Sequence, residues 1–136
     1  EIYTLSLHDA LPILIESMQT SSKKLSKKNQ QNITEQFITL LSDLRHPDEC
    51  EYFFKSFLTK TEQSVFAKRL GIVWMLHQQE SYKDIKKKLK VSSATISSIA
   101  GQMDDKGTQL IVDKLRVDDW AGRWTKKIMG FFQAKS

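Results

Sequence analysis

Apolar side chains recur at intervals of three and four residues from Ile33 onward, which is the period of an amphipathic α-helix. The first such stretch ends ahead of Pro47. Proline suits the first turn of a following helix, where its missing N–H is not needed. We expect Asn32 or Thr34 to cap the start of the first helix. Its apolar positions are Ile33, Phe37, Leu40, Leu41 and Leu44.

A second and a third predicted helix carry more apolar surface. Thr59 or Thr61 is expected to cap the third helix, and Glu62 follows Thr59 by three residues, as in a capping box. The third helix is apolar on more than one side, which predicts burial in a core or at a subunit interface. The second helix carries Tyr52, Phe53, Phe54, Phe57 and Leu58, and the third carries Val65, Phe66, Leu70, Val73, Trp74 and Leu76.

Two short helices are predicted next, over residues 82–89 and 92–103, with Ser81 and Ser92 as caps. A short helix, a tight turn and a second helix have the proportions of a helix-turn-helix. Lys90 occupies the turn, where glycine often supplies a left-handed conformation, so the lysine implies some strain or a different turn. The residues expected to hold the two helices together are Ile85, Leu89, Val91, Ile96 and Ile99, with Met103 also pointing inward.

The sequence shows neither a convincing strand nor an internal repeat. The predicted fold is therefore all-α, a helical bundle with a helix-turn-helix at 81–103. We assign the main domain to residues 32–106. An ordinary solvated helical hairpin over the same two helices is the alternative at this stage.

The N-terminal end differs from the middle of the chain. Residues 1–17 look like the translation of a sequencing-adapter read, so Met18 is the expected natural start, and a genuine short helix or tail is the alternative. Residues 18–31 are polar and rich in lysine, which predicts a flexible basic arm. Such an arm can hold phosphates nonspecifically or simply keep the protein soluble.

The C-terminal end has its own pattern. Gly107 is expected to mark a break, and residues 107–136 to form a helical extension. An apolar stripe in this extension favours packing in the core or at a dimer interface, and a helix lying on a membrane surface is the alternative. The stripe consists of Trp120, Trp124, Ile128, Phe131 and Phe132.

Composition narrows the classes of partner. The chain has 136 residues, 40% hydrophobic and 27% charged, which suits one modest globular domain. Its net charge of +5 favours an acidic partner such as nucleic acid. Cys50 is the sole cysteine, so the sequence has neither a disulfide framework nor a cysteine metal cage, and a cytoplasmic location is expected.

An enzyme is the weakest of the functional classes. The three histidines, His8, His46 and His77, are scattered, and the sequence has no spacing typical of a nucleophile–base pair or of metal ligands. The five glycines stand singly, so a phosphate-cradling loop is missing too. We expect no catalysis, no metal and no cofactor.

The helix-turn-helix region combines long cations with short hydroxyl side chains. Lysines on its first helix and in its turn suit phosphate contacts, which release counterions and make affinity depend on salt. Short side chains at the start of the second helix allow close approach to base edges in the major groove. The lysines are Lys83, Lys86, Lys87 and Lys90, and the short residues are Ser92, Ser93, Ala94, Thr95 and Ser97.

Several motifs in this region occur in one order. They are "DECEYFFKSFLT", then "RL-IV-ML", "SY-DI" and "S-ATIS", within a stretch that includes "LTKTEQSVFAKRLGIVWMLHQQESYKDIKKKLKVSSATISS". This ordered set resembles the tryptophan repressor family over about residues 48–103. The resemblance implies an intertwined, all-helical homodimer whose paired helix-turn-helix units bind operator DNA.

The resemblance also implies roles for single residues. Tyr82, Lys83 and Lys86 on the first helix, and Ser93, Ala94 and Ser97 on the second, fall where the family meets DNA. Thr59 and Arg69 fall where the tryptophan repressor holds its bound amino acid. The second arginine of that pocket is Ser98 here. A serine cannot replace a bidentate carboxylate partner, so we expect that tryptophan is not the corepressor. For Arg69, an ion pair on the helix surface or at an interface is the alternative.

Two functional hypotheses remain in competition. The first is a sequence-specific, DNA-binding transcriptional regulator that acts as a dimer. The second is a helical protein-interaction module in which the lysines only keep a hydrophobic bundle soluble. The first predicts a salt-dependent preference for particular DNA sequences, whereas the second predicts no DNA retardation even at low salt.

Overall fold

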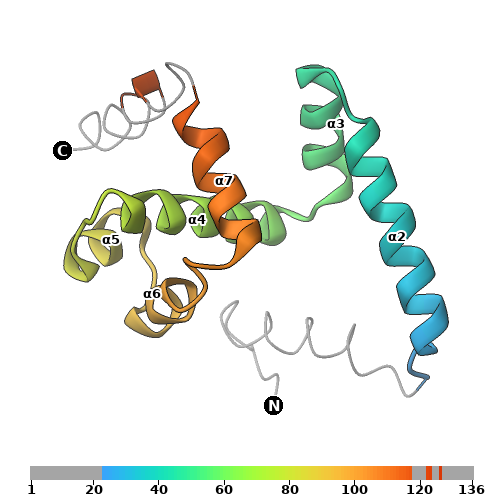
Figure 1. Ribbon diagram of the computed structural model, residues 1–136, viewed down its shortest axis with the longest axis horizontal. Helices are drawn as coiled ribbons and strands as arrows, with labels where there is room; N and C mark the ends of the chain where they lie inside the picture. The colour runs from blue at the N-terminus through green and yellow to red at the C-terminus, as the bar shows by residue number, and fades with distance from the viewer. Residues whose placement is uncertain (1–22, 118–121, 124–125, 127–136) are drawn as a thin grey trace, which may run out of the picture. The chain divides into compact units, whose positions relative to one another are not determined.

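The computed structural model describes residues 23–117 together with 122, 123 and 126, and this part of the chain is all-α (Figure 1). Within it no strand occurs. The chain divides into two compact units, Glu1–Cys50 and Glu51–Ser136. The helices are α2 (Lys27–Asp43), α3 (Pro47–Phe57), α4 (Lys60–His77), α5 (Tyr82–Leu89), α6 (Ser93–Ala100) and α7 (Lys106–Arg116).

The first unit contains α2, which begins earlier than its apolar pattern predicts. Its N-cap is Ser26, whose hydroxyl accepts a hydrogen bond from the Asn29 N–H at 3.2 Å. The expected caps Asn32 and Thr34 lie inside the helix, so that prediction was wrong. Residues 27–31, assigned to the flexible arm, are helical because lysine and glutamine are good helix formers, although they add nothing to the apolar period.

Helix α3 begins at Pro47, as predicted, and extends across the division between the two units. Its start is tied by the Glu49 carboxylate, which accepts from the backbone N–H groups of Arg45 and His46 at 3.2 and 3.4 Å. Further along α3, the Glu51 carboxylate pairs with Lys55, which lowers the pKa of Glu51 through a hydrogen bond and Coulombic attraction.

The turn into α4 confirms the predicted capping box. The Thr59 hydroxyl accepts from the Glu62 N–H at 3.2 Å, and the Glu62 carboxylate accepts from the Thr59 N–H at 2.7 Å. The backbone hydrogen bond from Thr59, and then its side chain, lower the pKa of Glu62. The Gln63 amide also donates to the carbonyl of Leu58 at 2.8 Å, which fastens the turn to the new helix.

Helix α4 is the centre of the second unit. Helices α5, α6 and α7 each contact it, and α5 contacts α6 (Figure 1). Each fully buried isoleucine or valine stabilises the fold by roughly 1.5–3 kcal/mol. The core formed in this way consists of Ile72, Val73, Met75, Ile85, Ile96, Ile99 and Val112, with Leu76, Leu89, Val91 and Met103 partly buried against it.

The segment after the helix-turn-helix differs from its prediction. Gly107 is not a break but lies in the first turn of α7. A glycine keeps its backbone N–H and lowers helix stability by only about 1 kcal/mol relative to alanine, so a single one does not end the helix. Residues 1–17 and the whole predicted apolar stripe, from Trp120 to Phe132, lie outside the described residues. In the described part of the chain, every helix is too short or too polar to span a bilayer.

Candidate nucleic-acid interface

Helices α5 and α6 are joined by three residues and form the predicted helix-turn-helix. Ile85 of α5 and Ile96 of α6 are fully buried, and Ile99 lies beside them in the same core. Leu89 and Val91 are partly buried against these residues. The residues expected to hold the motif together therefore do so. Met103 also packs there, although α6 itself ends at Ala100.

The turn of the motif is left-handed at Lys90, with φ 54° and ψ 54°. A residue with a side chain loses about 1 kcal/mol of stability in this left-handed conformation. This is the backbone strain that the sequence predicted for a lysine at this position. The Lys90 N–H donates to the carbonyl of Lys86 at 3.0 Å and closes α5. From the neighbouring helix α4, the ammonium group of Lys68 donates to the Lys90 carbonyl at 3.3 Å.

Serine caps begin both helices, as predicted. The Ser81 hydroxyl accepts from the Asp84 N–H at 3.1 Å and donates to the Asp84 carboxylate at 2.7 Å. The Ser92 hydroxyl accepts from the Thr95 N–H at 3.2 Å and lies 2.9 Å from the Thr95 hydroxyl. The hydroxyls of Ser92 and Thr95 are thus engaged with each other at the start of α6.

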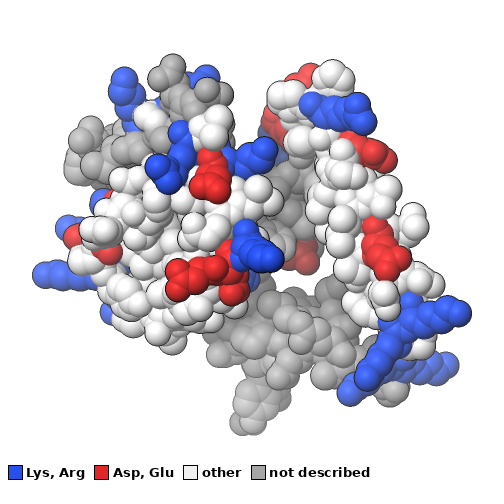
Figure 2. All heavy atoms as spheres, viewed as in Figure 1, with Lys and Arg blue, Asp and Glu red and all other residues white. Residues whose placement is uncertain are grey.

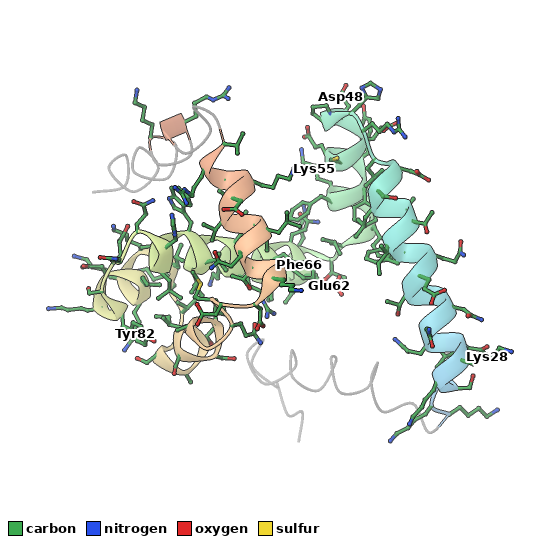
Figure 3. The ribbon with its side chains drawn as sticks, viewed as in Figure 1. Lys28, Asp48, Lys55, Glu62, Phe66 and Tyr82 are labelled. Atoms are coloured by element: carbon green, nitrogen blue, oxygen red, sulfur yellow. The ribbon has the colours of Figure 1, made fainter. Side chains whose placement is uncertain are left out.

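The remaining short residues of α6 present a small, polar surface. Ser93, Ala94 and Ser97 are exposed, whereas Ile96 and Ile99 of the same helix are buried. None of the side chains of Ser93, Ala94 and Ser97 is bulky, so the backbone of α6 can approach another surface closely. Tyr82, at the start of α5, is 41% exposed (Figure 3).

Positive charge surrounds this polar surface. Residues 81–103 contain five lysines and one aspartate, Asp84, which leaves a net charge of +4. Lys88 faces inward and pairs with the Glu80 carboxylate at 2.6 Å. Lysine side chains project from the region of α5 in Figure 2. The exposed ones in the motif are Lys83, Lys86, Lys87 and Lys90.

A groove of about 690 Å³ separates α4 from the turn and α6. Arg69 and Ser98 both line it, together with Lys68, Lys90 and Thr95. Thr59 does not line this groove, since it lies at the start of α4, where its hydroxyl caps the helix. The structure therefore brings together Arg69 and Ser98 but places Thr59 of the same chain elsewhere.

The guanidinium of Arg69 has a partner within the chain. It donates to the side-chain oxygen of Gln102 at 2.9 Å, across 33 positions of sequence. Arg69 and Gln102 also line a second groove, of about 400 Å³, between α4 and α7. Its apolar lining includes Phe66 of α4, labelled in Figure 3, and Ile111 of α7. Sequence reasoning missed the contacts of Lys68 and Gln102, because nothing local marks either residue.

Comparison with known proteins agrees with this arrangement. The family whose model matches is described as Trp repressor protein, and the match covers residues 32–109, more than half of the chain. This span contains α3, α4 and the whole helix-turn-helix. No curated protein and no solved structure matches the chain. The family match confirms the resemblance that the ordered motifs indicated, and the chain belongs to the Trp repressor protein family.

Proposed function

We propose that this protein is a sequence-specific, DNA-binding transcriptional regulator that acts as a dimer through α5 and α6. The observation that carries the proposal is the outward face of the motif. Small side chains are exposed on α6 and lysines are exposed on α5, the two helices contact each other, and the apolar residues of both belong to the core. A duplex groove has the complementary chemistry, with phosphates at its edges and bases at its floor.

The exposed residues divide by the task that each suits. Lysines from α5 and the turn hold phosphates and supply affinity that falls with salt. On α6, Ser93 and Ser97 can exchange hydrogen bonds with base edges, and the methyl group of Ala94 can contact thymine. Ser92 and Thr95 lie at the same end but support the helix start. The proposed DNA-binding residues are Tyr82, Lys83, Lys86, Lys87, Ser92, Ser93, Ala94, Thr95 and Ser97.

Dimerisation is supported by apolar surface that a single chain leaves exposed. Neither α2 nor α3 has a buried residue, although both have apolar stripes. In α2, for example, Ile33 is 58% exposed and Leu40 is 45% exposed. A second copy of the chain would cover such stripes, and two motifs would read more bases than one. The site of action would be the cytoplasm.

Tryptophan is a poor fit as an effector of this protein. An amino-acid carboxylate binds best between two guanidinium groups or to one in bidentate geometry. In the groove beside α6, Ser98 offers only a hydroxyl, and Arg69 donates to Gln102. Thr59 and Arg69 are therefore a weak pocket for this amino acid.

Selection of bound sequences from a random DNA pool tests the main proposal. Fluorescence anisotropy on the selected site should then show a steep loss of affinity with salt. Replacing Lys86 or Lys87 by alanine should weaken binding to every sequence alike and reduce the salt slope by about 0.9 per lysine. Ser93→Ala should change the sequence preference instead. Lys114→Ala, an exposed lysine on α7, is the matched control and should change neither quantity.

The exposed apolar faces favour one other function, a helical protein-interaction module. Val65 and Phe66 on α4, and Leu110 on α7, are each about half exposed. In this case the purified protein would fail to retard any DNA at low salt, and the Lys86 and Lys87 variants would behave like the wild type. A selected DNA site bound with a steep salt dependence would rule this function out as the main one.

A further inference from the structure

We infer that Lys68 and Arg69, consecutive residues of α4, are positioning residues that hold α6 at both of its ends and thereby set the base preference of the protein. The inference rests on the proposed function. The Lys68 ammonium group reaches the carbonyl of Lys90, two residues before the cap of α6, at 3.3 Å. The Arg69 guanidinium reaches Gln102, two residues after α6 ends, at 2.9 Å.

The helix that provides these two donors is a firm base. Immediately after Arg69, α4 has a continuous buried stretch from Gly71 to Met75, with Ile72 fully buried. Gly71 allows Leu89 of α5 to approach closely, since a Cβ at position 71 would lie only 3.1 Å from a Leu89 methyl carbon. The two donors therefore lie directly before the best-buried part of α4.

Helix α6, by contrast, has few buried side chains of its own to fix its rotation, although Val91 before it and Met103 after it also pack against the core. It has eight residues, and only Ile96 and Ile99 are buried. Side-chain tips lie about 5 Å from a helix axis, so a rotation of about 10° moves them by about 1 Å. Recognition needs side chains held within about 0.5 Å. Hydrogen bonds at both ends of α6 restrict this rotation. The two buried isoleucines hold only the middle and the C-terminal end of the helix.

Both bonds join a cation to a neutral acceptor near the surface, so neither is an ion pair. Lys90 has a left-handed backbone conformation, and its carbonyl is the one that accepts the bond from Lys68. Exposed hydrogen bonds of this kind contribute little to overall stability. Loss of these two hydrogen bonds is therefore expected to alter the orientation of α6 and to leave the fold intact.

The test measures the affinity of the full chain for the selected DNA site and for random DNA. The variants are Lys68→Met, which removes the donor, and Gln102→Ala, which removes the Arg69 acceptor without changing charge. Lys60→Met, an exposed lysine of α4, and Gln31→Ala, which loses an exposed bond to Glu35, are the matched controls. Gln102→Glu keeps an acceptor for Arg69 and should rescue the wild-type preference.

We expect the double variant, Lys68→Met with Gln102→Ala, to lower the ratio of specific to random affinity about tenfold, the size of one mismatched base pair. Its random-DNA affinity, salt slope and melting temperature should stay near those of the wild type, as should all properties of the controls. A lower salt slope in Lys68→Met would instead make Lys68 a phosphate contact and overturn its positioning role.

Other outcomes distinguish a failure of the positioning role of Lys68 and Arg69 from a failure of the proposed function. If the double variant keeps its sequence preference, or loses specific and random affinity together with thermal stability, the inference is overturned and the proposed function stands. If the wild type selects no DNA sequence at all, the proposed function and the inference fail together. If the double variant loses the sequence preference and the Gln102→Glu variant keeps it, the result supports both the proposed function and the inference.

Discussion

At the scale of single residues, Ser92 supports the start of α6 twice, through the Thr95 N–H and through the Thr95 hydroxyl. Replacing a serine N-cap by alanine costs about 1 kcal/mol. We therefore expect Ser92→Ala to lower the free energy of unfolding by about this amount in urea titrations. Ser93→Ala, one position later and outside the cap, should leave it unchanged. Equal losses in the two variants would contradict a capping role for Ser92.

Glu62 should make stability depend on pH, because the Thr59 N–H lowers the pKa of its carboxyl below 4.5. A carboxyl with a lower pKa in the folded state adds stability above its unfolded pKa and loses it as the pH falls through the folded pKa. The stability difference between the wild type and Glu62→Gln should therefore be largest near neutral pH and shrink below about pH 4.5. Urea titrations at a series of pH values measure it.

The Glu51–Lys55 pair provides the comparison for this effect. The pKa of Glu51 is also lowered, but by an exposed cation, so the effect of Glu51→Gln should weaken at high salt. The Glu62 effect depends mainly on a backbone N–H and should respond less to salt. A Glu62→Gln difference that stays constant from pH 7 to pH 3 would contradict the assignment.

The groove residues make a prediction about tryptophan. Arg69 bonds Gln102 and Ser98 has no charge, so an amino-acid carboxylate finds no pair of guanidinium groups there. We expect calorimetric titration with tryptophan to give no binding heat at physiological concentrations, and DNA affinity to be the same with and without it. A micromolar affinity would contradict this expectation.

These residues also show how far sequence reasoning reaches. The caps at Thr59, Ser81 and Ser92 were predictable because donor and acceptor lie three residues apart. The bonds from Lys68 to Lys90 and from Arg69 to Gln102 span 22 and 33 positions. Their partners depend on how α4 packs against the motif, which no local pattern records.

At the scale of elements, the turn between α5 and α6 combines backbone strain at Lys90 with a charge that we propose contacts a phosphate. Glycine relieves the left-handed strain, so Lys90→Gly should raise the free energy of unfolding by about 0.5–1 kcal/mol. It should also weaken binding to all DNA alike and reduce the salt slope by about 0.9, because one phosphate contact is lost. Thermal unfolding and anisotropy measure the two effects.

Gln79 provides the matched control, since it is the other residue with a positive φ outside glycine in the described part of the chain, at 61°. Gln79→Gly relieves similar strain without removing charge. It should raise stability and leave DNA binding unchanged. A lower free energy of unfolding in Lys90→Gly would contradict the prediction. It would mean that the lysine side chain stabilises the fold by more than its left-handed backbone destabilises it.

Element boundaries were predictable where apolar period and capping agreed. Helices α4, α5 and α6 begin at or beside their predicted caps, because buried isoleucines and serine or threonine caps mark the same places. The start of α2 was missed because residues 27–31 carry no apolar side chain to extend the period. For α7, the single glycine at position 107 was mistaken for a break.

At the scale of the whole molecule, the described chain keeps much of its apolar surface uncovered. Helix α2 has an apolar stripe that includes Ile33, Leu40 and Leu41, yet none of these is buried. The small core around Ile72 belongs to the second unit alone. A second copy is the partner that the family membership favours, and we expect the protein in solution to have twice the mass of the 15.7 kDa chain.

A charge placed on the apolar stripe of α2 tests whether the protein is a dimer, and a charge placed elsewhere on α2 is the control. Leu40→Glu puts a carboxylate where the partner would pack, and burying it unpaired should weaken dimerisation at least about tenfold. Ile38 is equally apolar and 59% exposed but lies off the stripe, so Ile38→Glu should leave the dimer intact. Sedimentation equilibrium measures the dimerisation of both variants.

If Leu40→Glu dissociates the dimer, the variant should also lose specific DNA binding. It should keep weak, salt-dependent DNA binding, because each chain still carries its lysines. A monomeric wild type with full sequence preference would contradict the dimeric mode of action.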